Sequence, residues 1–211
     1  MTTIPDAEYL SKLTLRSRCG TGKPGDRCAI QEVRAWEGLD PSVDECPPDA
    51  DPLIVSLVIR VQDADPKWRA AIVPLLPLIP GSHGSDALQW RRLYRCADWQ
   101  IRQVIPSLCD FYPGMRDAAK ALRGLAPITD RQTAKLAADQ LDLARDRDRA
   151  LDRALALDLD LARDLDRADR AARALDLALA RAIYRARALD LDRDLDPFGL
   201  IAELLAMKET E

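Results

Sequence analysis

The sequence predicts an all-α protein in which a compact helical domain is followed by a long helix, or helical hairpin, rich in Ala, Leu, Asp and Arg. In the first half, Asp-Pro pairs mark helix starts, because Asp caps free backbone N–H groups and Pro suits the next position, which has no hydrogen bond to donate. All aromatic residues except Tyr184 and Phe198 precede residue 113, which places the compact core in that half. From Ile128 to Asp196 the chain contains no Gly, Pro, Ser or Asn, as expected of an uninterrupted helix.

Composition and charge argue against a nucleic-acid partner and against a membrane span. The formal net charge of −4 provides no basic surface for a polyanion, so we expect no nucleic-acid partner. The most apolar stretch, residues 51–82, is interrupted by Arg60, Asp63 and several prolines, so we expect no membrane span. The first residues, MTTIPDAEYLSKL, lack the basic-then-apolar pattern of a signal peptide, which predicts a cytoplasmic protein. Because the cytoplasm is reducing, we expect the five cysteines to be free thiols rather than disulfides.

The first half is expected to contain a flexible segment over residues 1–25 and the compact domain over 26–126. The Asp-Pro pairs at 40–41, 51–52 and 65–66 each predict a helix start. The helices should cover about 27–37, 52–62 and 66–79, with a further helix after Ser85 that Pro106 kinks or ends. The stretch IVSLV has β-branched character, but one strand alone would find no partner in this chain.

Several motifs of this domain occur together: Cys28, Glu32 and Ala35 at Cys-x-x-x-Glu-x-x-Ala spacing, an Asp-rich segment over 44–52, a Pro-bounded turn over 77–80, and Ala-Asp-Trp-x-x-Arg over 97–102. With these motifs, residues 25–112 resemble an uncharacterised protein family found in actinobacteria and their phages. The resemblance implies a helical domain with an Ala-rich helical tail, and it implies no activity.

The second half, 128–196, is expected to be a long helical arm that begins at a capping box formed by Thr129 and Gln132. A β-strand is excluded because its faces would be Leu/Arg and Ala/Asp, and neither could be buried. As a helix, the arm carries Leu and Ala at an unbroken 4-3 spacing in alternating large and small layers. This interaction stripe comprises Leu161, Leu165, Ala168, Ala172, Leu175, Leu179, Ala182, Ala186 and Leu189.

A continuous helix over 130–195 would extend roughly 100 Å at about 1.5 Å per residue, so its leucines require a partner surface. Pairing with another copy of the chain is the first interpretation, and a hairpin that folds back on the N-terminal domain is the second. Residues 197–211 should form a short amphipathic helix that docks through Phe198, Ile201, Leu204 and Leu205.

Candidate chemistry is sparse. Cys28 follows Asp26 at an expected helix N-terminus, where the helix dipole would lower the pKa of a thiol. With His83 as base and Asp44 or Asp98 as orienting group, a Cys-His hydrolase is conceivable. The competing interpretation, which we favour, is a packed thiol and a solvated loop histidine.

Three ligand-binding patterns are incomplete. CGTGKPG, residues 19–25, lacks the first Gly and the final hydroxyl of a phosphate loop, and it is expected as a flexible loop. Cys19, Cys28, Cys46 and His83 have no zinc-knuckle spacing, and Cys96 and Cys109 should be buried as small hydrophobic residues. DLDRDLD, residues 190–196, lacks the Gly and Glu of a calcium loop. We therefore expect neither a cofactor nor a metal.

The sequence thus favours a non-enzymatic helical protein whose arm mediates self-assembly or binds another protein. The alternatives are a small Cys/His-dependent enzyme or metal-binding module, and a phage or host-conflict factor that binds and occludes a protein target.

Overall fold

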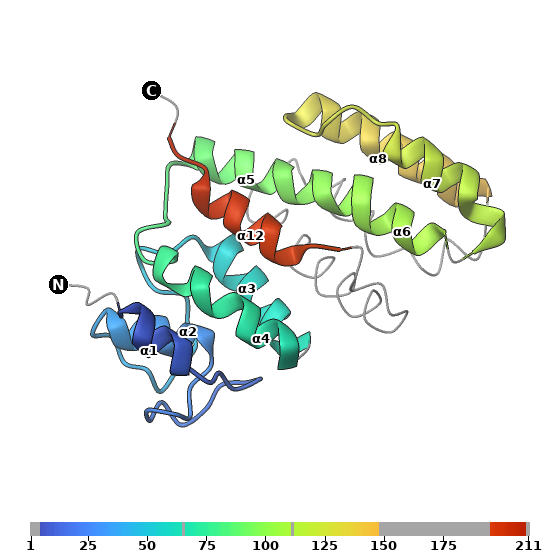
Figure 1. Ribbon diagram of the computed structural model, residues 1–211. Coiled ribbons are helices and arrows are strands. Elements are labelled where there is room, and N and C mark those ends of the chain that lie inside the picture. Colours follow the sequence, from blue (N-terminus) through green and yellow to red (C-terminus); the bar gives the residue numbers. More distant parts are fainter. Residues whose placement is uncertain (1–4, 65, 111, 148–194, 210–211) are drawn as a thin grey trace. The chain divides into compact units, whose positions relative to one another are not determined.

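The computed structural model describes residues 5–64, 66–110, 112–147 and 195–209, which are helical and contain no strand (Figure 1). The predicted all-α class is confirmed. Two compact units divide the chain: Met1–Ser85 with Pro197–Glu211 form the first, and Asp86–Asp196 form the second. Within the described ranges, no helix combines the length and apolar character that crossing a membrane requires. The predicted domain boundary at residues 126–128 stays a prediction, because most of the arm lies outside the described residues.

The first unit is built around α3 (Pro52–Ala64), whose side chains Ile54, Leu57, Val58 and Val61 are buried. The helix begins as the Asp-Pro pair predicts: the Asp51 carboxylate accepts from the backbone N–H groups of Leu53 (2.9 Å) and Ile54 (3.3 Å). The β-branched stretch IVSLV lies inside this helix, because the apolar surroundings outweigh its preference for strands.

Shorter helices surround α3: α1 (Ala7–Lys12), α2 (Ala29–Trp36) and α4 (Pro66–Ile72). The helix predicted over 66–79 changes at its middle into the 3₁₀ segment η1 (Val73–Leu78). Pro74 and Pro77 explain this change, because neither can donate the backbone hydrogen bond that would continue an α-helix.

The helix start predicted at Asp40-Pro41 is wrong, since these residues form a turn. The Asp40 carboxylate accepts from the backbone N–H and the hydroxyl of Ser42, both at 2.8 Å. This is an Asx-turn, the alternative local use of an Asp side chain.

The C-terminal helix α12 (Pro197–Ala206) belongs to the first unit and packs against α3 and η1. Leu200, Ile201 and Leu204 are buried, and Phe198 meets Trp68 edge to face with ring centroids 5.9 Å apart. The predicted docking face is therefore correct except that Leu200, rather than Leu205, is buried. Beyond the helix, the Glu209 carboxylate accepts from the backbone N–H and hydroxyl of Ser85, both at 2.6 Å.

In the second unit, α5 (Asp86–Trp99) continues through the π-helical turn η2 (Gln100–Val104) into α6 (Ile105–Cys109), forming the long green rod of Figure 1. The Ile105 N–H donates to the Gln100 carbonyl, five residues back. Pro106 accounts for the wider turn, because its ring would clash with the carbonyl four residues earlier in an α-helix. The expected kink at Pro106 thus takes the form of a π-turn.

After the 3₁₀ turn η3 (Pro113–Met115), α7 (Arg116–Arg123) packs on α6, and α8 (Arg131–Arg147) packs on α7. The start of α8 is one residue later than the predicted Thr129–Gln132 capping box. The Asp130 carboxylate accepts from the Thr133 N–H (2.8 Å), and the Thr133 hydroxyl accepts from the Asp130 N–H (3.1 Å). The reciprocal pair satisfies two free donors at once. The interaction stripe from Leu161 to Leu189 lies outside the described residues.

Candidate functional site

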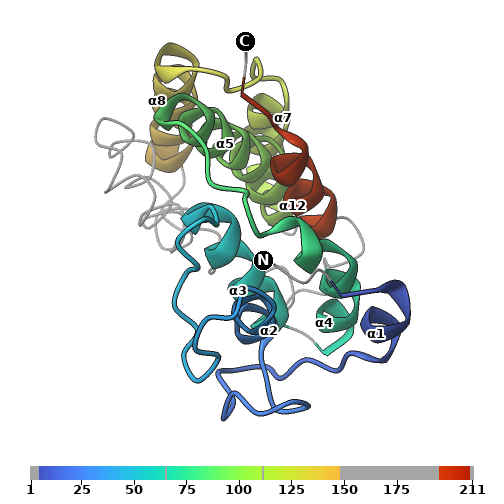
Figure 2. The same ribbon diagram turned by 90° about the vertical axis from the view of Figure 1, so that its left-hand side faces the viewer.

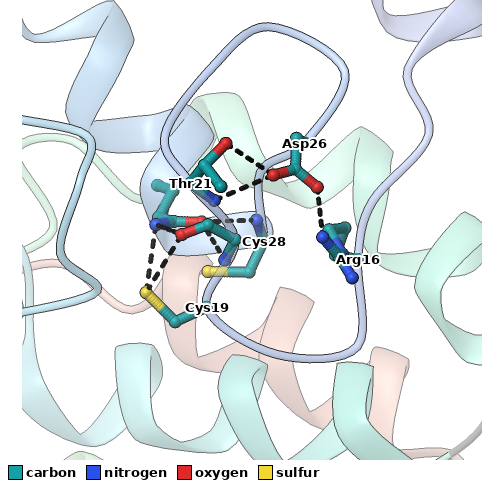
Figure 3. Close-up of polar contacts among 7 residues, drawn as sticks. Arg16, Cys19, Thr21, Asp26 and Cys28 are labelled. Atoms are coloured by element: carbon teal, nitrogen blue, oxygen red, sulfur yellow. Dashed lines mark hydrogen bonds and ion pairs between the residues drawn. The ribbon is translucent and has the colours of Figure 1, made fainter.

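The loop from Arg16 to Arg27, predicted to be flexible, has a specific hydrogen-bonded structure (Figure 3). Its ends are joined by the Arg16 N–H, which donates to the Arg27 carbonyl at 2.9 Å. At its centre, the Asp26 carboxylate accepts from the backbone N–H (2.9 Å) and hydroxyl (2.6 Å) of Thr21, and it forms an ion pair with Arg16. These hydrogen bonds, those of Thr21 first, hold the pKa of Asp26 at about 2.

The same contacts show how residues 19–25 differ from a phosphate loop. A phosphate loop offers its backbone N–H groups to an external anion. Here the Thr21 N–H is taken by Asp26, and the Gly20 N–H donates to the Gln31 side-chain oxygen at 2.8 Å. Two backbone N–H groups of the loop thus donate to side chains of the chain itself.

Gln31 of α2 links the loop to both Cys19 and Cys28. Its buried side-chain N–H₂ donates to the Cys19 sulfur and to the Gly20 carbonyl, each at 3.0 Å. Its oxygen also accepts from the Cys28 backbone N–H at 3.1 Å. Gln31 therefore acts as the returning half of a cap on α2, whose N-cap is Cys28.

Cys28 lies at the predicted helix N-terminus, and it is packed there as the favoured interpretation expected. The side chain is completely buried, and this burial raises the pKa of the thiol, outweighing the backbone hydrogen bonds of Gln31 and Ile30 that lower it. The predicted lowering of this pKa is therefore wrong. The helix-terminus effect is present but smaller than desolvation.

The structure does not bring together the residues of the conceivable Cys-His site. His83 is exposed, and its backbone N–H donates to the Asp49 carbonyl at 2.8 Å. Asp44 is also exposed and influences Cys28 only through its charge, which raises the pKa of the thiol further. Asp98 belongs to the second unit. Among the residues that the structure describes, none of the interactions of Cys28 involves His83 or another basic side chain.

The remaining cysteines provide no metal site. Among the residues that the structure describes, no group of three or more His, Cys, Asp or Glu side chains is arranged to hold a metal ion. Cys96 and Cys109 are buried as predicted, and burial raises the pKa of the Cys109 thiol to about 12. Desolvation, followed by the charges of Asp51 and Asp49, raises the pKa of Cys46 to about 11. Such thiols remain protonated and are poor nucleophiles.

A buried carboxylate network in the second unit centres on Asp98, which the sequence had offered as an orienting group and as part of the Ala-Asp-Trp-x-x-Arg motif. Asp98 accepts from Arg102 at 3.0 Å and from Arg95 at 3.5 Å, and also from the Ile128 backbone N–H at 2.9 Å. The last bond joins α5 to the segment that precedes α8. This arrangement fixes the entry of α8 and leaves the carboxylate oxygens occupied, which indicates a structural role.

A shallow groove in the first unit lies between α1 and the α4–η1 segment, which Figure 2 shows side by side. It has a volume of about 410 Å³, and Leu10, Val73 and Pro74 are among the residues that line it. Ser11 contributes a hydroxyl, and none of the described residues that line the groove is charged. The groove has apolar surface without a set of reactive groups, so it provides no basis for catalysis.

One carboxyl pair in the first unit was not predicted from the sequence. Glu37 follows the end of α2, and its carboxyl is hydrogen-bonded to that of Asp49. Burial, and then this neighbour, raise the pKa of Glu37 to about 7. Asp49 also accepts from the Gly81 N–H through its side chain (3.1 Å) and from the His83 N–H through its carbonyl (2.8 Å). The acidic segment DECPPDAD was a visible signal, but nothing in its spacing pointed to Glu37 as its partner.

Comparisons with models of protein families, with curated proteins and with solved structures found no match for this chain, so no relative supplies an activity, a partner or a residue role.

Proposed function

We propose that this protein is a non-enzymatic helical interaction protein whose Ala/Leu-rich arm, residues 128–196, pairs with a second copy of the chain or with another protein. The observation that carries the proposal is the packing of α8, the described beginning of the arm. Its buried side chains Ala134, Ala137, Ala138 and Leu141 follow one another at helical spacing, and α8 packs against α7. The residue types of the arm thus form a buried helix face where the structure describes them.

The sequence beyond α8 repeats this composition at a regular spacing. Small Ala layers let two helices approach closely, and Leu layers fill the space between them. The nine stripe positions from Leu161 to Leu189 alternate between these two sizes. Because apolar side chains at such spacing are stabilised by leaving water, we expect the stripe to bury its leucines against a second helix.

The described chemistry also favours an interaction protein over a Cys/His-dependent enzyme. Cys28 is buried with a raised pKa, and its described interactions include no basic side chain, while His83 lies in an exposed loop. An activated thiol would require a lowered pKa and a neighbouring base.

The test is the molar mass of the full-length protein by light scattering over a range of concentrations. We compare the native chain with Leu175→Asp/Leu179→Asp, which places charges on the stripe. The matched control is Leu177→Asp, a leucine between the two that lies off the stripe. Circular dichroism of each variant checks that the helices remain.

We expect a dimer or larger assembly for the native chain and for the control, and a monomer for the double variant. A monomeric native chain at every concentration would eliminate self-assembly and leave only a different protein as the partner. Equal dissociation of the control and the double variant would show that the stripe is not the contact.

A further inference from the structure

The carboxyl pair of Glu37 and Asp49 has a feature that the proposed function does not use. The Glu37 oxygen Oε2 is buried, and no N–H or O–H group of the described residues donates to it. The Glu37 carboxyl is nevertheless hydrogen-bonded to that of Asp49. Two carboxylates cannot donate to one another, so the contact is favourable only when one of them carries a proton.

The groups that face the pair do not neutralise it. Arg34, the nearest cation, uses its guanidinium to bind the backbone carbonyls of Asp40 (2.7 Å) and Glu45 (3.1 Å). It lowers the pKa of Glu37 by charge, but less than burial and Asp49 raise it.

The other groups near the pair engage in contacts of their own. Cys46 is protonated, and the Asp51 carboxylate caps α3. The 3₁₀ segment η1, which packs on α2, has no titratable side chain, and in α3 the charges of Arg60 and Asp63 act on each other. His83 reaches Asp49 through its backbone.

Asp49 joins three parts of the first unit. Its side chain meets Glu37 at the end of α2, it stands in the turn that leads to α3, and it holds the Gly81 and His83 backbone N–H groups. Asp49 is also exposed, so the pair can exchange its proton with solvent.

We propose that a single proton shared by Glu37 and Asp49 fastens the end of α2 to the turn that holds the Gly81–His83 loop, and that loss of this proton loosens the junction. The shared proton is lost as the pH rises through neutrality. Above the transition both carboxyls are negative, the hydrogen bond between them is lost and their charges repel. The turn at Asp49, no longer fastened to α2, then opens more often, and the hydrogen bonds that Asp49 accepts from the Gly81 and His83 N–H groups open with it.

The direction of the pH effect follows from the raised pKa of Glu37. In the folded protein the group keeps its proton up to about pH 7, whereas in the unfolded chain it loses the proton near its ordinary value of 4.5. The contribution to stability is therefore fully present below the unfolded value and is lost as the pH rises through the folded value.

The experiment measures amide hydrogen exchange of Gly81 and His83 in the full-length protein from about pH 5.5 to about pH 8.5. After correction for intrinsic exchange, we expect protection of both amides to fall above the transition, by at most about tenfold for each pH unit if one proton is involved. The midpoint of thermal unfolding should fall over the same range by on the order of 3 °C, since solvent screens an exposed partner.

Glu37→Gln is the decisive variant, because its amide donates to Asp49 at every pH. We expect it to remove the pH dependence and to be more stable than the native protein at the alkaline end. Asp49→Asn, which keeps an oxygen for the Gly81 N–H, should also remove it. Asp40→Asn is the matched control: Asp40 is exposed beside the same helix end and has a lowered pKa, so the native pH dependence should remain.

An unchanged pH dependence in Glu37→Gln and Asp49→Asn would overturn the proposal, as would constant protection of Gly81 and His83 across the range in the native protein. A pH dependence that disappears when a chelator is added would also overturn it, because a bound cation rather than a proton would then bridge the pair.

Discussion

Replacing Gly20, Gly22 and Gly25 by Ala, one at a time, tests whether residues 16–27 form the packed loop that the structure shows. The three positions differ in what a methyl group would meet. At Gly20 a Cβ would lie 1.9 Å from the Asp26 carbonyl oxygen. At Gly22 it would lie 2.7 Å from the Pro41 carbonyl oxygen, and φ is +79°. At Gly25 φ is also +79°, but nothing lies within 4 Å.

The free energies of unfolding should follow these differences. A left-handed backbone costs an Ala residue about 1–2 kcal/mol, while the loss of glycine freedom in the unfolded chain offsets about 0.4–1 kcal/mol. Gly25→Ala should therefore reduce stability by about 1 kcal/mol or less. Gly20→Ala forces backbone atoms apart and should cost about 1–3 kcal/mol. Gly22→Ala combines both effects, and we expect it to cost the most, about 2–4 kcal/mol.

The assay is urea unfolding of the full-length protein followed by circular dichroism, with all four proteins measured under one condition. A constant dependence of the free energy on urea would show that the variants unfold as the native protein does. The informative quantity is the order of the three midpoints, because the variants share one loop and one kind of substitution.

Two outcomes would refute the reasoning. If all three variants lie within about 0.5 kcal/mol of the native protein, the loop does not hold the described hydrogen bonds in solution. If Gly25→Ala is the least stable, the backbone path of the loop differs from the one described, because no atom would meet its methyl group.

Two further predictions concern packing. Leu141→Ala should cost about 2–5 kcal/mol in urea unfolding, because Leu141 is completely buried, whereas Leu136→Ala on the same helix should stay within about 0.5 kcal/mol, because Leu136 is 56% exposed. A thiol reagent should label the exposed Cys19 in the native protein and Cys28 only as fast as the structure opens, which mass spectrometry of the labelled peptides can follow. Labelling of Cys28 at the rate of Cys19 would contradict its burial.

Helix starts were predictable where an Asp-Pro pair precedes an apolar sequence. Asp51-Pro52 is followed by LIVSLVIRV, and the apolar side chains of that stretch become buried in α3. Asp40-Pro41 carries the same local signal but is followed by SVDECPPDAD, which has no apolar face to bury. A cap alone does not make a helix, because most helix stability comes from packing. The Asp40 side chain therefore formed a turn.

The polar clusters were less predictable because they depend on the path of the chain. The position of Cys28 at a helix N-terminus could be inferred locally, but its burial depends on how α2 packs against α3. The Glu37–Asp49 pair joins a helix end to a turn beyond an irregular segment, and no periodicity relates the two residues. Local rules place residues along one element, whereas such pairs form between elements.

The polar groups of the described residues are used to stabilise the fold, and this indicates which part of the chain is free to bind a partner. A catalytic group must be able to exchange its own hydrogen bonds for those of a substrate. Asp26 is occupied by Thr21 and Arg16, Gln31 by the loop and the start of α2, and Asp98 by two arginines and the Ile128 N–H. These groups stabilise turns and helix ends. A substrate that displaced them would break those stabilising hydrogen bonds. These contacts support our proposal that recognition depends instead on the leucines and alanines that follow Ile128 in the sequence.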